Sequence, residues 1–234
     1  MYKYEMHLHT SRTSACAISD AKEMVAAAKE NGYAGIVLTN HFFHGNTAVD
    51  RSLPWEEFFN AYVDDYVEAV KYGKEIDMDV FFGIEEGIGG GKEVLIYGVP
   101  AKAYLECSDF LTKDIYGISK FVHDNGGYIA MAHPFRHRNY IANPDAEPDL
   151  TPFDAIEVFN QCNTKEDNEH ARQFAEKNDF PVIAGSDIHL ASKYADKTFG
   201  GSGIAFEKRL YTEKEFIKQL KNGNYKLIKN GKIV

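Results

Sequence analysis

Histidines and carboxylates follow the ends of short apolar runs at five places in this chain. The residues are His7 and His9, then His41, then Glu85 with Glu86, then His133, and finally Asp187 with His189. Imidazole and carboxylate groups are the ligands that Zn²⁺, Mn²⁺ and Fe²⁺ accept, and a mixture of both suits a hydrolytic site with several ions. Random placement rarely puts such a residue after each of five apolar runs, so the joint pattern predicts a metal site.

Local spacing agrees with this prediction. His7 and His9 are two residues apart, so in an extended strand both side chains point to the same side. Asp187 and His189 repeat that spacing. A single histidine at a strand end is more often a surface or hydrogen-bonded residue than a ligand. The prediction therefore depends on all five places together.

The elements that would position these residues alternate along the chain. Strands are expected over residues 2–9, 35–39, 80–85, 94–98, 128–132, 155–159, 182–185 and 203–206, and helices over 19–32, 54–76, 115–125, 164–177 and 213–222. A strand followed by a helix, repeated about seven times, predicts parallel βαβ units in a barrel-like α/β fold. In such a barrel the C-terminal ends of the strands meet on one face, where active sites are built.

The 234 residues have 44% apolar and 26% charged character, which is typical of one globular domain. We see no linker, so residues 1–234 are expected to form a single domain. Its final part, residues 207–234, is predicted to be a helix and a short hairpin that turns at Asn230-Gly231.

Composition also limits the partners and the compartment. No apolar run approaches the ~18–20 residues that span a bilayer, and the first residues lack the apolar segment of a secretory signal. Cys16, Cys107 and Cys162 form no Cys-x-x-Cys pair, which favours a reducing cytoplasm. The net charge of −9 disfavours an extended surface for nucleic acid or for anionic membranes.

The motifs resemble those of the PHP (polymerase and histidinol phosphatase) family of metal-dependent phosphoesterases. The matching pieces, in the family's order, are His7-Leu8-His9-Thr10, Thr39-Asn40-His41, Gly83-Ile84-Glu85, Ala132-His133-Pro134 and Gly185-Ser186-Asp187-Ile188-His189. They extend over the chain to about residue 206. The resemblance implies a distorted (β/α)7 TIM-like barrel with two or three divalent ions (Zn, Mn or Fe) at its C-terminal mouth.

The resemblance also implies a ligand for each metal. The first metal would be held by His7, His9, Glu85 and Asp187; Glu85 would bridge to a second metal on His133; and His41 and His189 would hold a third. Glu85 is preferred to Glu86 because Gly83-Ile84-Glu85 has the family spacing. No catalytic side chain is expected beyond the metal-activated water, which Glu85 and Asp187 would assist. Asn40 and Glu157 are expected to orient the ligands.

The chain departs from the family pattern at two positions. Ser14 and Ala15 stand where the family often has Asp or His, and Leu95 stands where it has a further histidine. Each change removes one ligand from a different metal, which puts the occupancy of all three metal positions in question. Cys16, the next residue along, is a candidate replacement ligand.

The expected reaction is hydrolysis of a phosphomonoester, either of a small metabolite or of a nucleotide. Arg12 and Arg136 each lie three residues past a ligand and are expected to contact the phosphate, with Arg138 and Lys193 as weaker candidates. One alternative is a metal-dependent amidohydrolase, although no strand end shows the lysine those barrels usually require. Another is a PHP-like scaffold or regulatory protein that has lost ligands. The oligomeric state is not predicted.

Overall fold

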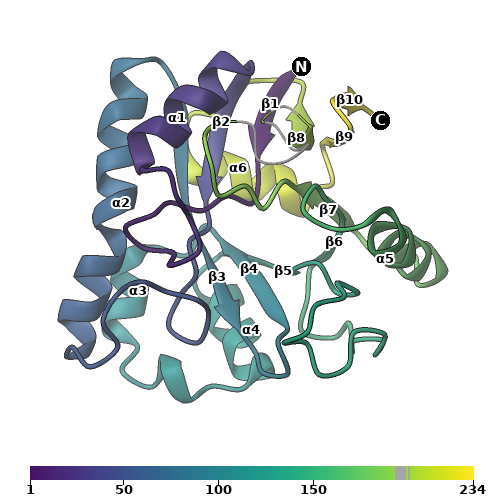
Figure 1. The fold of residues 1–234 in the computed structure, drawn as a ribbon, viewed down its shortest axis with the longest axis horizontal. Coiled ribbons are helices and arrows are strands. Elements are labelled where there is room, and N and C mark those ends of the chain that lie inside the picture. The colour runs from purple at the N-terminus through teal and green to yellow at the C-terminus, as the bar shows by residue number, and fades with distance from the viewer. Residues whose placement is uncertain (193–198, 200) are drawn as a thin grey trace.

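A computed structural model describes residues 1–192, 199 and 201–234, so the candidate Lys193 lies outside the described residues. A curled mixed sheet forms its centre, with the strand order β10-β9-β8-β1-β2-β3-β4-β5-β6-β7 (Figure 1). The strands are β1 (Tyr2–Glu5), β2 (Tyr33–Leu38), β3 (Asp79–Gly87), β4 (Glu93–Tyr97), β5 (Tyr128–Met131), β6 (Ala155–Asn160), β7 (Val182–Gly185), β8 (Ser202–Phe206), β9 (Lys226–Lys229) and β10 (Lys232–Ile233).

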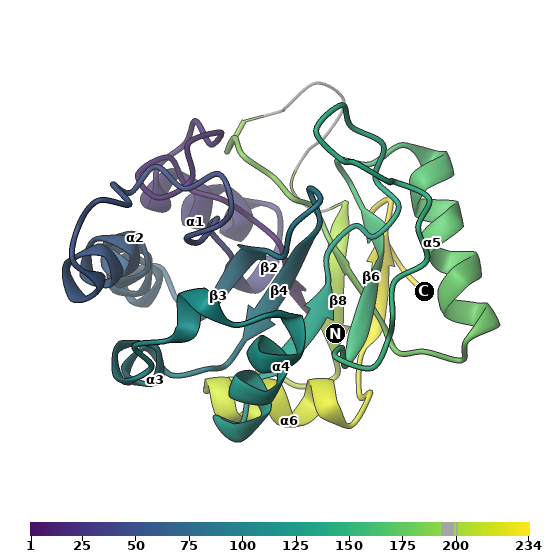
Figure 2. The same cartoon turned by 90° about the horizontal axis from the view of Figure 1, so that it is seen from below.

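Helices cover the outside of this sheet. They are α1 (Ala21–Glu30), α2 (Trp55–Glu75), α3 (Ala101–Glu106), α4 (Ile115–Asp124), α5 (Lys165–Lys177) and α6 (Glu213–Lys221), with a 3₁₀ turn η1 (Phe110–Thr112). Helices α1 and α2 lie together on one side, and α5 lies on the opposite side against β6 (Figures 1 and 2). Within the described part of the chain, no helix is long and apolar enough to cross a membrane.

The five predicted helices are confirmed, and their caps explain where they begin. Asp20 accepts a hydrogen bond from the backbone of Glu23, whose side chain accepts one from the Asp20 backbone in return; this capping box starts α1. Thr164 and Asp167 start α5 in the same way. The short α3 and η1 were not predicted, because elements this short show too little periodicity to be read from a sequence. The terminal hairpin is confirmed as β9 and β10.

The predicted parallel βαβ units account for only part of the sheet. Strands β1, β2 and β3 are parallel, as are β5, β6 and β7, but β4 is antiparallel to both of its neighbours and β8 is antiparallel to β1. Only residues 88–92 join β3 to β4, whereas a parallel crossover needs a dozen residues or more. The fold is a mixed α/β sheet that curls, and the expected (β/α)7 barrel is not confirmed.

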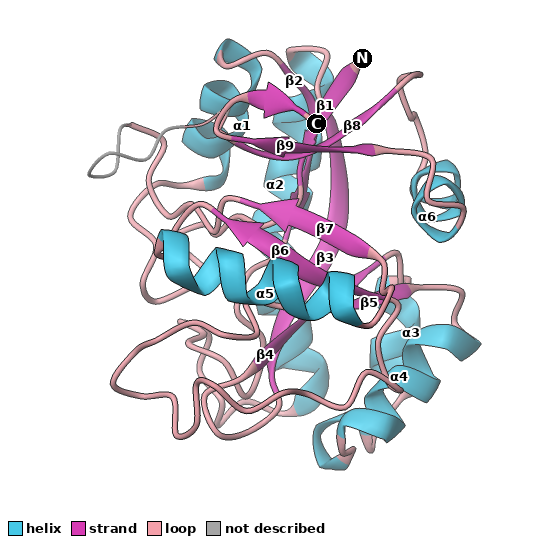
Figure 3. Cartoon of the chain, turned by 90° about the vertical axis from the view of Figure 1, so that its right-hand side faces the viewer, coloured by secondary structure: helices cyan, strands magenta, loops and turns pink. Residues whose placement is uncertain are grey.

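Helix α6 covers one end of the curled sheet and leaves the other end free for the histidines. The ring of Phe216 packs against Phe81 and Tyr4, with centroids 4.9 and 6.2 Å apart. Tyr4 and Phe81 belong to the apolar core inside the sheet, together with Leu95 and Tyr97. Figure 3 shows α6 beside the sheet, with α5 crossing in front of β6 and β7. The apolar core therefore lies directly beneath the C-terminal ends of the parallel strands.

Candidate metal centre

The seven predicted ligands lie together at the C-terminal ends of the strands. His7 and His9 follow β1, His41 follows β2, Glu85 lies near the end of β3, His133 follows β5, and Asp187 and His189 follow β7. Four overlapping groups place their ligand atoms within 4.8 Å of one another and could hold a metal: His9, His41 and His189; His7, His9 and Glu85; His7, His133 and Asp187; and His41, Glu85 and Glu93. Residues that are far apart in the sequence thus form one compact cluster.

Glu85 is the central carboxylate of this cluster. Its Oε1 lies 3.0 Å from Nε2 of His133 and 3.1 Å from Nε2 of His7, and its Oε2 lies 2.8 Å from Nδ1 of His41. Burial raises the pKa of Glu85, but the charges of His7 and His41 outweigh it and hold that pKa well below its ordinary value. A carboxylate with both oxygens facing different histidines is suited to bridge two cations. Glu86 faces elsewhere and contacts His44, as expected for the next residue in a strand.

Asp187 joins the cluster to an arginine. Its Oδ1 lies 3.1 Å from Nε2 of His9, while its Oδ2 accepts a hydrogen bond of 2.5 Å from Nη2 of Arg136. Burial raises the pKa of Asp187, yet the charges of Arg136 and His7 outweigh it and keep that pKa well below its ordinary value. Asp187 and His133 also have positive φ angles of 57° and 27°. Such strain costs roughly 1–3 kcal/mol per residue and tends to gather at functional sites.

The hydrogen bonds of His9 show that the cluster fits a cation. Ser14 donates its hydroxyl hydrogen to Oδ1 of Asn40, so its oxygen must accept from Nδ1–H of His9, 3.1 Å away. The Nε2 lone pair of His9 then faces carboxylate oxygens of Asp187 at 3.1 Å and of Glu85 at 3.4 Å. Burial and the charges of His189 and His41 hold the pKa of His9 well below its ordinary value, so the ring is neutral.

Lone pairs at such distances repel one another unless a cation lies between them. Among the described residues, Nε2 of His7, Nε2 of His9, Nδ1 of His41 and Oε2 of Glu85 are buried atoms without a hydrogen-bond partner. Buried polar atoms are otherwise almost always paired in folded proteins. The residues present therefore fit one or more divalent ions.

Glu157 and Asn40 contact this cluster in different ways. Glu157 accepts from Nδ1 of His7 at 3.0 Å through one oxygen and from the backbone N–H of His133 at 3.0 Å through the other. It therefore orients two candidate ligands. Asn40 acts indirectly. Its Oδ1 accepts a hydrogen bond from the hydroxyl of Ser14, and Ser14 in turn contacts His9. Ser14, a position where the family often has a ligand, thus serves to fix the His9 ring.

Glu93 is a member of the cluster that the sequence interpretation missed. Its Oε1 lies 3.3 Å from Nδ1 of His41, and its Oε2 lies 3.6 Å from Nε2 of His133. Leu95 pairs with Glu85 across the β3–β4 hairpin and is buried in the apolar core. Residues two apart on a strand point to the same face of the sheet. Glu93 therefore presents its carboxylate on the same face as Leu95, two residues closer to the C-terminal end of β3, where the cluster lies. The signal that could have identified it was the glycine turn at residues 89–91, which makes the next strand return beside β3.

Glu5 is a second residue that was missed, and it lies beneath the site. Its Oε1 accepts from the backbone N–H of His7 at 3.1 Å and of Ser186 at 2.8 Å. Burial raises the pKa of Glu5 to about 7. The carboxyl group thereby aligns the two segments that carry His7 and Asp187. A glutamate inside the apolar run Tyr4-Glu5-Met6 was the available signal.

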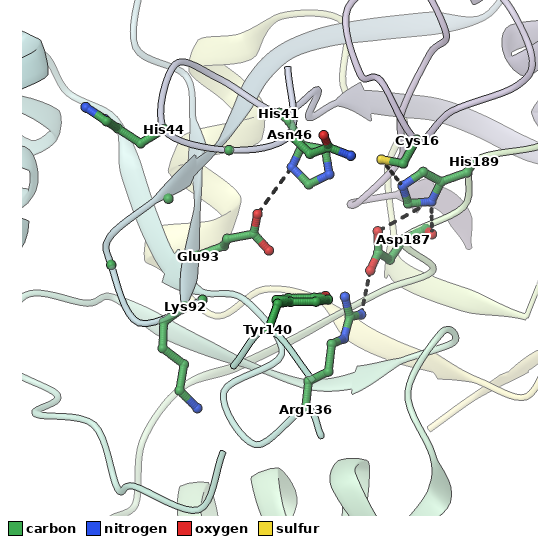
Figure 4. A pocket seen from close by; sticks show the side chains of 14 residues that line it. Cys16, His41, His44, Asn46, Lys92, Glu93, Arg136, Tyr140, Asp187 and His189 are labelled. Atoms are coloured by element: carbon green, nitrogen blue, oxygen red, sulfur yellow. Dashed lines mark hydrogen bonds and ion pairs between the residues drawn. The ribbon is translucent and has the colours of Figure 1, made fainter. Parts of the chain in front are cut away.

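A cavity of about 570 Å³ opens above the cluster (Figure 4). Its lining includes Cys16, His41, Lys92, Glu93, Arg136, Tyr140, Asp187 and His189. Arg136 is buried and donates Nε–H to Asn163 at 2.7 Å, which holds its guanidinium beside Asp187.

Arg12, the other arginine predicted to contact the phosphate, is not among the residues that line this cavity. Its side chain is 57% exposed, and its guanidinium pairs with Asp65 and Glu68 on α2.

Comparisons with solved structures identify the class of fold. The chain superposes on a two-domain protein of Bacteroides vulgatus that contains a predicted PHP-like metal-dependent phosphoesterase, with a TM-score of 0.71, 14% identity, and coverage of 99% of this chain and 66% of that one. An amidohydrolase of Chromobacterium violaceum, solved with bound sulfate and no metal, superposes with a TM-score of 0.57 and 12% identity, and the alignment covers 84% of this chain and 90% of that one. The lesion-specific endonuclease of Pyrococcus furiosus superposes with a TM-score of 0.59 and 14% identity, and the alignment covers 97% of this chain and 57% of that one.

The C-terminal part of the chain adds an independent match. Residues 165–225 match the PHP-associated family. This match and the shared fold agree with the resemblance seen in the five motifs. No curated protein matches the chain. The chain spans 66% of the length of the Bacteroides protein and 57% of the Pyrococcus one.

Proposed function

We propose that this protein is a metal-dependent phosphoesterase that hydrolyses a phosphomonoester of a small metabolite or a nucleotide. The observation that carries the proposal is the unpaired Nε2 of His9, which faces carboxylate oxygens of Asp187 and Glu85, an arrangement that a bound cation would stabilise. Two or three ions (Zn, Mn or Fe) would be held by the seven predicted ligands together with Glu93. The divalent ions, when bound, neutralise phosphoryl oxygens and lower the pKa of a water toward ~7.

The chain's own residues supply binding and orientation. Arg136 lines the cavity with its guanidinium fixed by Asn163 and Asp187, so it would meet a phosphoryl oxygen without first losing side-chain freedom. Glu157 accepts a hydrogen bond from Nδ1–H of His7 and so orients the ring with its Nε2 toward the cluster. A cavity of about 570 Å³ has room for a small phosphorylated molecule.

An amidohydrolase is the alternative that the Chromobacterium neighbour brings forward. Those barrels usually require a lysine among the ligands. Among the described residues that line the cavity Lys92 is the one lysine, and its ammonium donates to the backbone carbonyls of Pro134 and Pro144 instead. Figure 4 shows its side chain pointing away from His41 and Glu93. This arrangement favours the phosphoesterase.

A panel of substrates tests the proposal. The protein, freed of metal and reloaded with Zn²⁺, Mn²⁺ or Fe²⁺, is assayed on p-nitrophenyl phosphate, bis-p-nitrophenyl phosphate, nucleoside monophosphates, duplex DNA with an abasic site, and an N-acyl amino acid. We expect release of phosphate from monoesters that chelation abolishes and that Asp187→Asn lacks. Amide hydrolysis or DNA cleavage without monoesterase activity would replace the proposed reaction. Inactivity of the loaded protein on every substrate would favour the scaffold.

A further inference from the structure

Cys16 lies at the edge of the histidine cluster rather than on a remote surface. Its Sγ is 3.1 Å from Nε2 of His189, and both residues line the cavity (Figure 4). The backbone on either side of the cysteine is tied down. The N–H of Ile18 donates to the carbonyl of His189 at 2.8 Å, and the N–H of Ala15 donates to the carbonyl of Asn46 at 2.9 Å. The sulfur is thus held in place beside the imidazole.

The hydrogen bonding of His189 directs a lone pair at this sulfur. Nδ1 of His189 lies 2.8 Å from the backbone carbonyl of Asp187, an acceptor, so Nδ1 carries the hydrogen. In its neutral form the ring then carries the Nε2 lone pair on the side of Cys16, where a metal could bind both atoms. A backbone carbonyl on one imidazole nitrogen is the arrangement that orients histidine ligands in metal sites.

Two further histidines, His9 and His41, lie beside His189. His9, His41 and His189 form one candidate metal group, and Nε2 of His9 is fully buried without a hydrogen-bond partner. A cysteine binds metals as the thiolate, and here its sulfur lies within reach of the same space that these imidazole nitrogens face.

We propose that Cys16 is a thiolate ligand, with His41 and His189, to one ion of the metal centre. This inference rests on the proposed function, because it places one more ligand in the same centre. On binding, the thiol proton passes to solvent and the sulfur forms the bond to the metal. Cysteine would thus supply the ligand that Ser14 and Ala15, the neighbouring residues, do not.

A thiolate changes which metal the centre prefers. Soft sulfur ligands favour Zn²⁺, whereas oxygen-rich sites suit Mn²⁺ and Mg²⁺. We therefore expect the Cys16→Ser substitution to weaken Zn²⁺ binding more than Mn²⁺ binding.

Cobalt absorption provides the direct test. The metal-free full chain is titrated with Co²⁺, which gives visible d–d bands in any tetrahedral or five-coordinate site and a near-ultraviolet sulfur-to-cobalt charge-transfer band only when a thiolate is bound. We expect both in the wild-type protein, loss of the charge-transfer band alone in Cys16→Ser, and both in the control Cys107→Ser. Cys107 is a suitable control because its Sγ contacts Asp109, away from the cavity.

Each other outcome overturns the inference. Visible bands without the charge-transfer band in the wild type would leave the metal centre intact and exclude Cys16 as a ligand. A band that persists in Cys16→Ser and disappears in Cys162→Ser would assign the thiolate to Cys162. No cobalt binding at all would overturn the metal centre as well. X-ray absorption of the zinc-loaded wild type needs no variant, and it should show a Zn–S distance of about 2.3 Å beside Zn–N distances of about 2.0–2.1 Å.

Discussion

Nδ1 of His7 lies 3.0 Å from Oε1 of Glu157, a residue 150 positions further along the chain. Nε2 of the same ring lies 3.1 Å from Oε1 of Glu85. Burial lowers the pKa of His7, but the charges of Glu85, Asp187 and Glu157 outweigh it and raise that pKa well above its ordinary value. The ring is thus held between an orienting carboxylate and the central carboxylate of the cluster.

Replacing Glu157 with Gln should weaken metal binding without removing a ligand. We expect the affinity to fall about 10- to 100-fold, because the carboxylate fixes the ring orientation and raises the basicity of His7. Competition with a chromophoric chelator measures the affinity. Glu147→Gln is the matched control, since Glu147 is exposed and pairs with Lys177 outside the cavity. Equal affinities of the Glu157 variant and the wild type would show that Glu157 does not orient the ligand.

Replacing Arg136 with Ala should impair turnover more than metal content. A charge-assisted hydrogen bond contributes about 1.5–3 kcal/mol, so kcat/KM for a phosphomonoester should fall roughly 10- to 100-fold. Steady-state kinetics and elemental analysis on the same preparation separate the two effects. Arg138→Ala serves as the control, because its exposed guanidinium bonds to the carbonyls of His137 and Cys162. Unchanged kinetics in Arg136→Ala would remove this arginine from the substrate site.

Replacing Glu93 with Ala should cost the centre one ion. Its carboxylate faces His41 and His133 from β4, where the family histidine is replaced by the buried Leu95. We expect elemental analysis after gel filtration to find about one ion fewer per chain, with an unchanged circular dichroism spectrum. Glu106→Ala, on the exposed side of α3, is the control. The prediction fails if Glu93→Ala retains the wild-type metal content.

The pair of His44 and the buried Glu86 should make stability depend on pH. Nδ1 of His44 lies 2.6 Å from Oε1 of Glu86, and this hydrogen bond raises the pKa of His44 above 6.5. A raised histidine pKa stabilises the fold fully below the ordinary value of 6.5, and the effect is lost as pH rises through the folded-state pKa.

The melting temperature of metal-free protein, recorded over a range of pH, tests this sign. Burial raises the pKa of Glu86 above 4.5, so the difference between wild type and His44→Gln should be largest in mild acid, where Glu86 is ionised and His44 is protonated, and should shrink toward alkaline pH. A difference that is constant or grows with pH would contradict the assignment.

Much of the site could be predicted because each ligand follows an apolar strand. His7, His41 and Asp187 are far apart in the sequence, but they come together since the parallel strands that precede them end on the same side of the sheet. Caps and periodicity likewise located the longer helices.

Other features depend on where side chains point, which spacing alone does not give. The turn at residues 89–91 predicts that residues 94–98 return antiparallel to the preceding strand, but only the structure shows that Glu93 then reaches the cluster. Arg12 and Arg136 have the same offset from a ligand, yet only Arg136 meets Asp187. Arg12 pairs instead with carboxylates on α2, and the position of that helix depends on tertiary packing.

Metal stoichiometry tests the central claim most directly. The protein is purified without chelator, reloaded with Zn²⁺, Mn²⁺ or Fe²⁺, and measured by elemental analysis beside Glu85→Gln, which removes the charge of the central carboxylate. We predict two or three ions per wild-type chain and fewer in the variant, with both proteins folded. A folded wild-type chain that binds no ion under any of these conditions would contradict the metal centre and the hydrolytic function built on it.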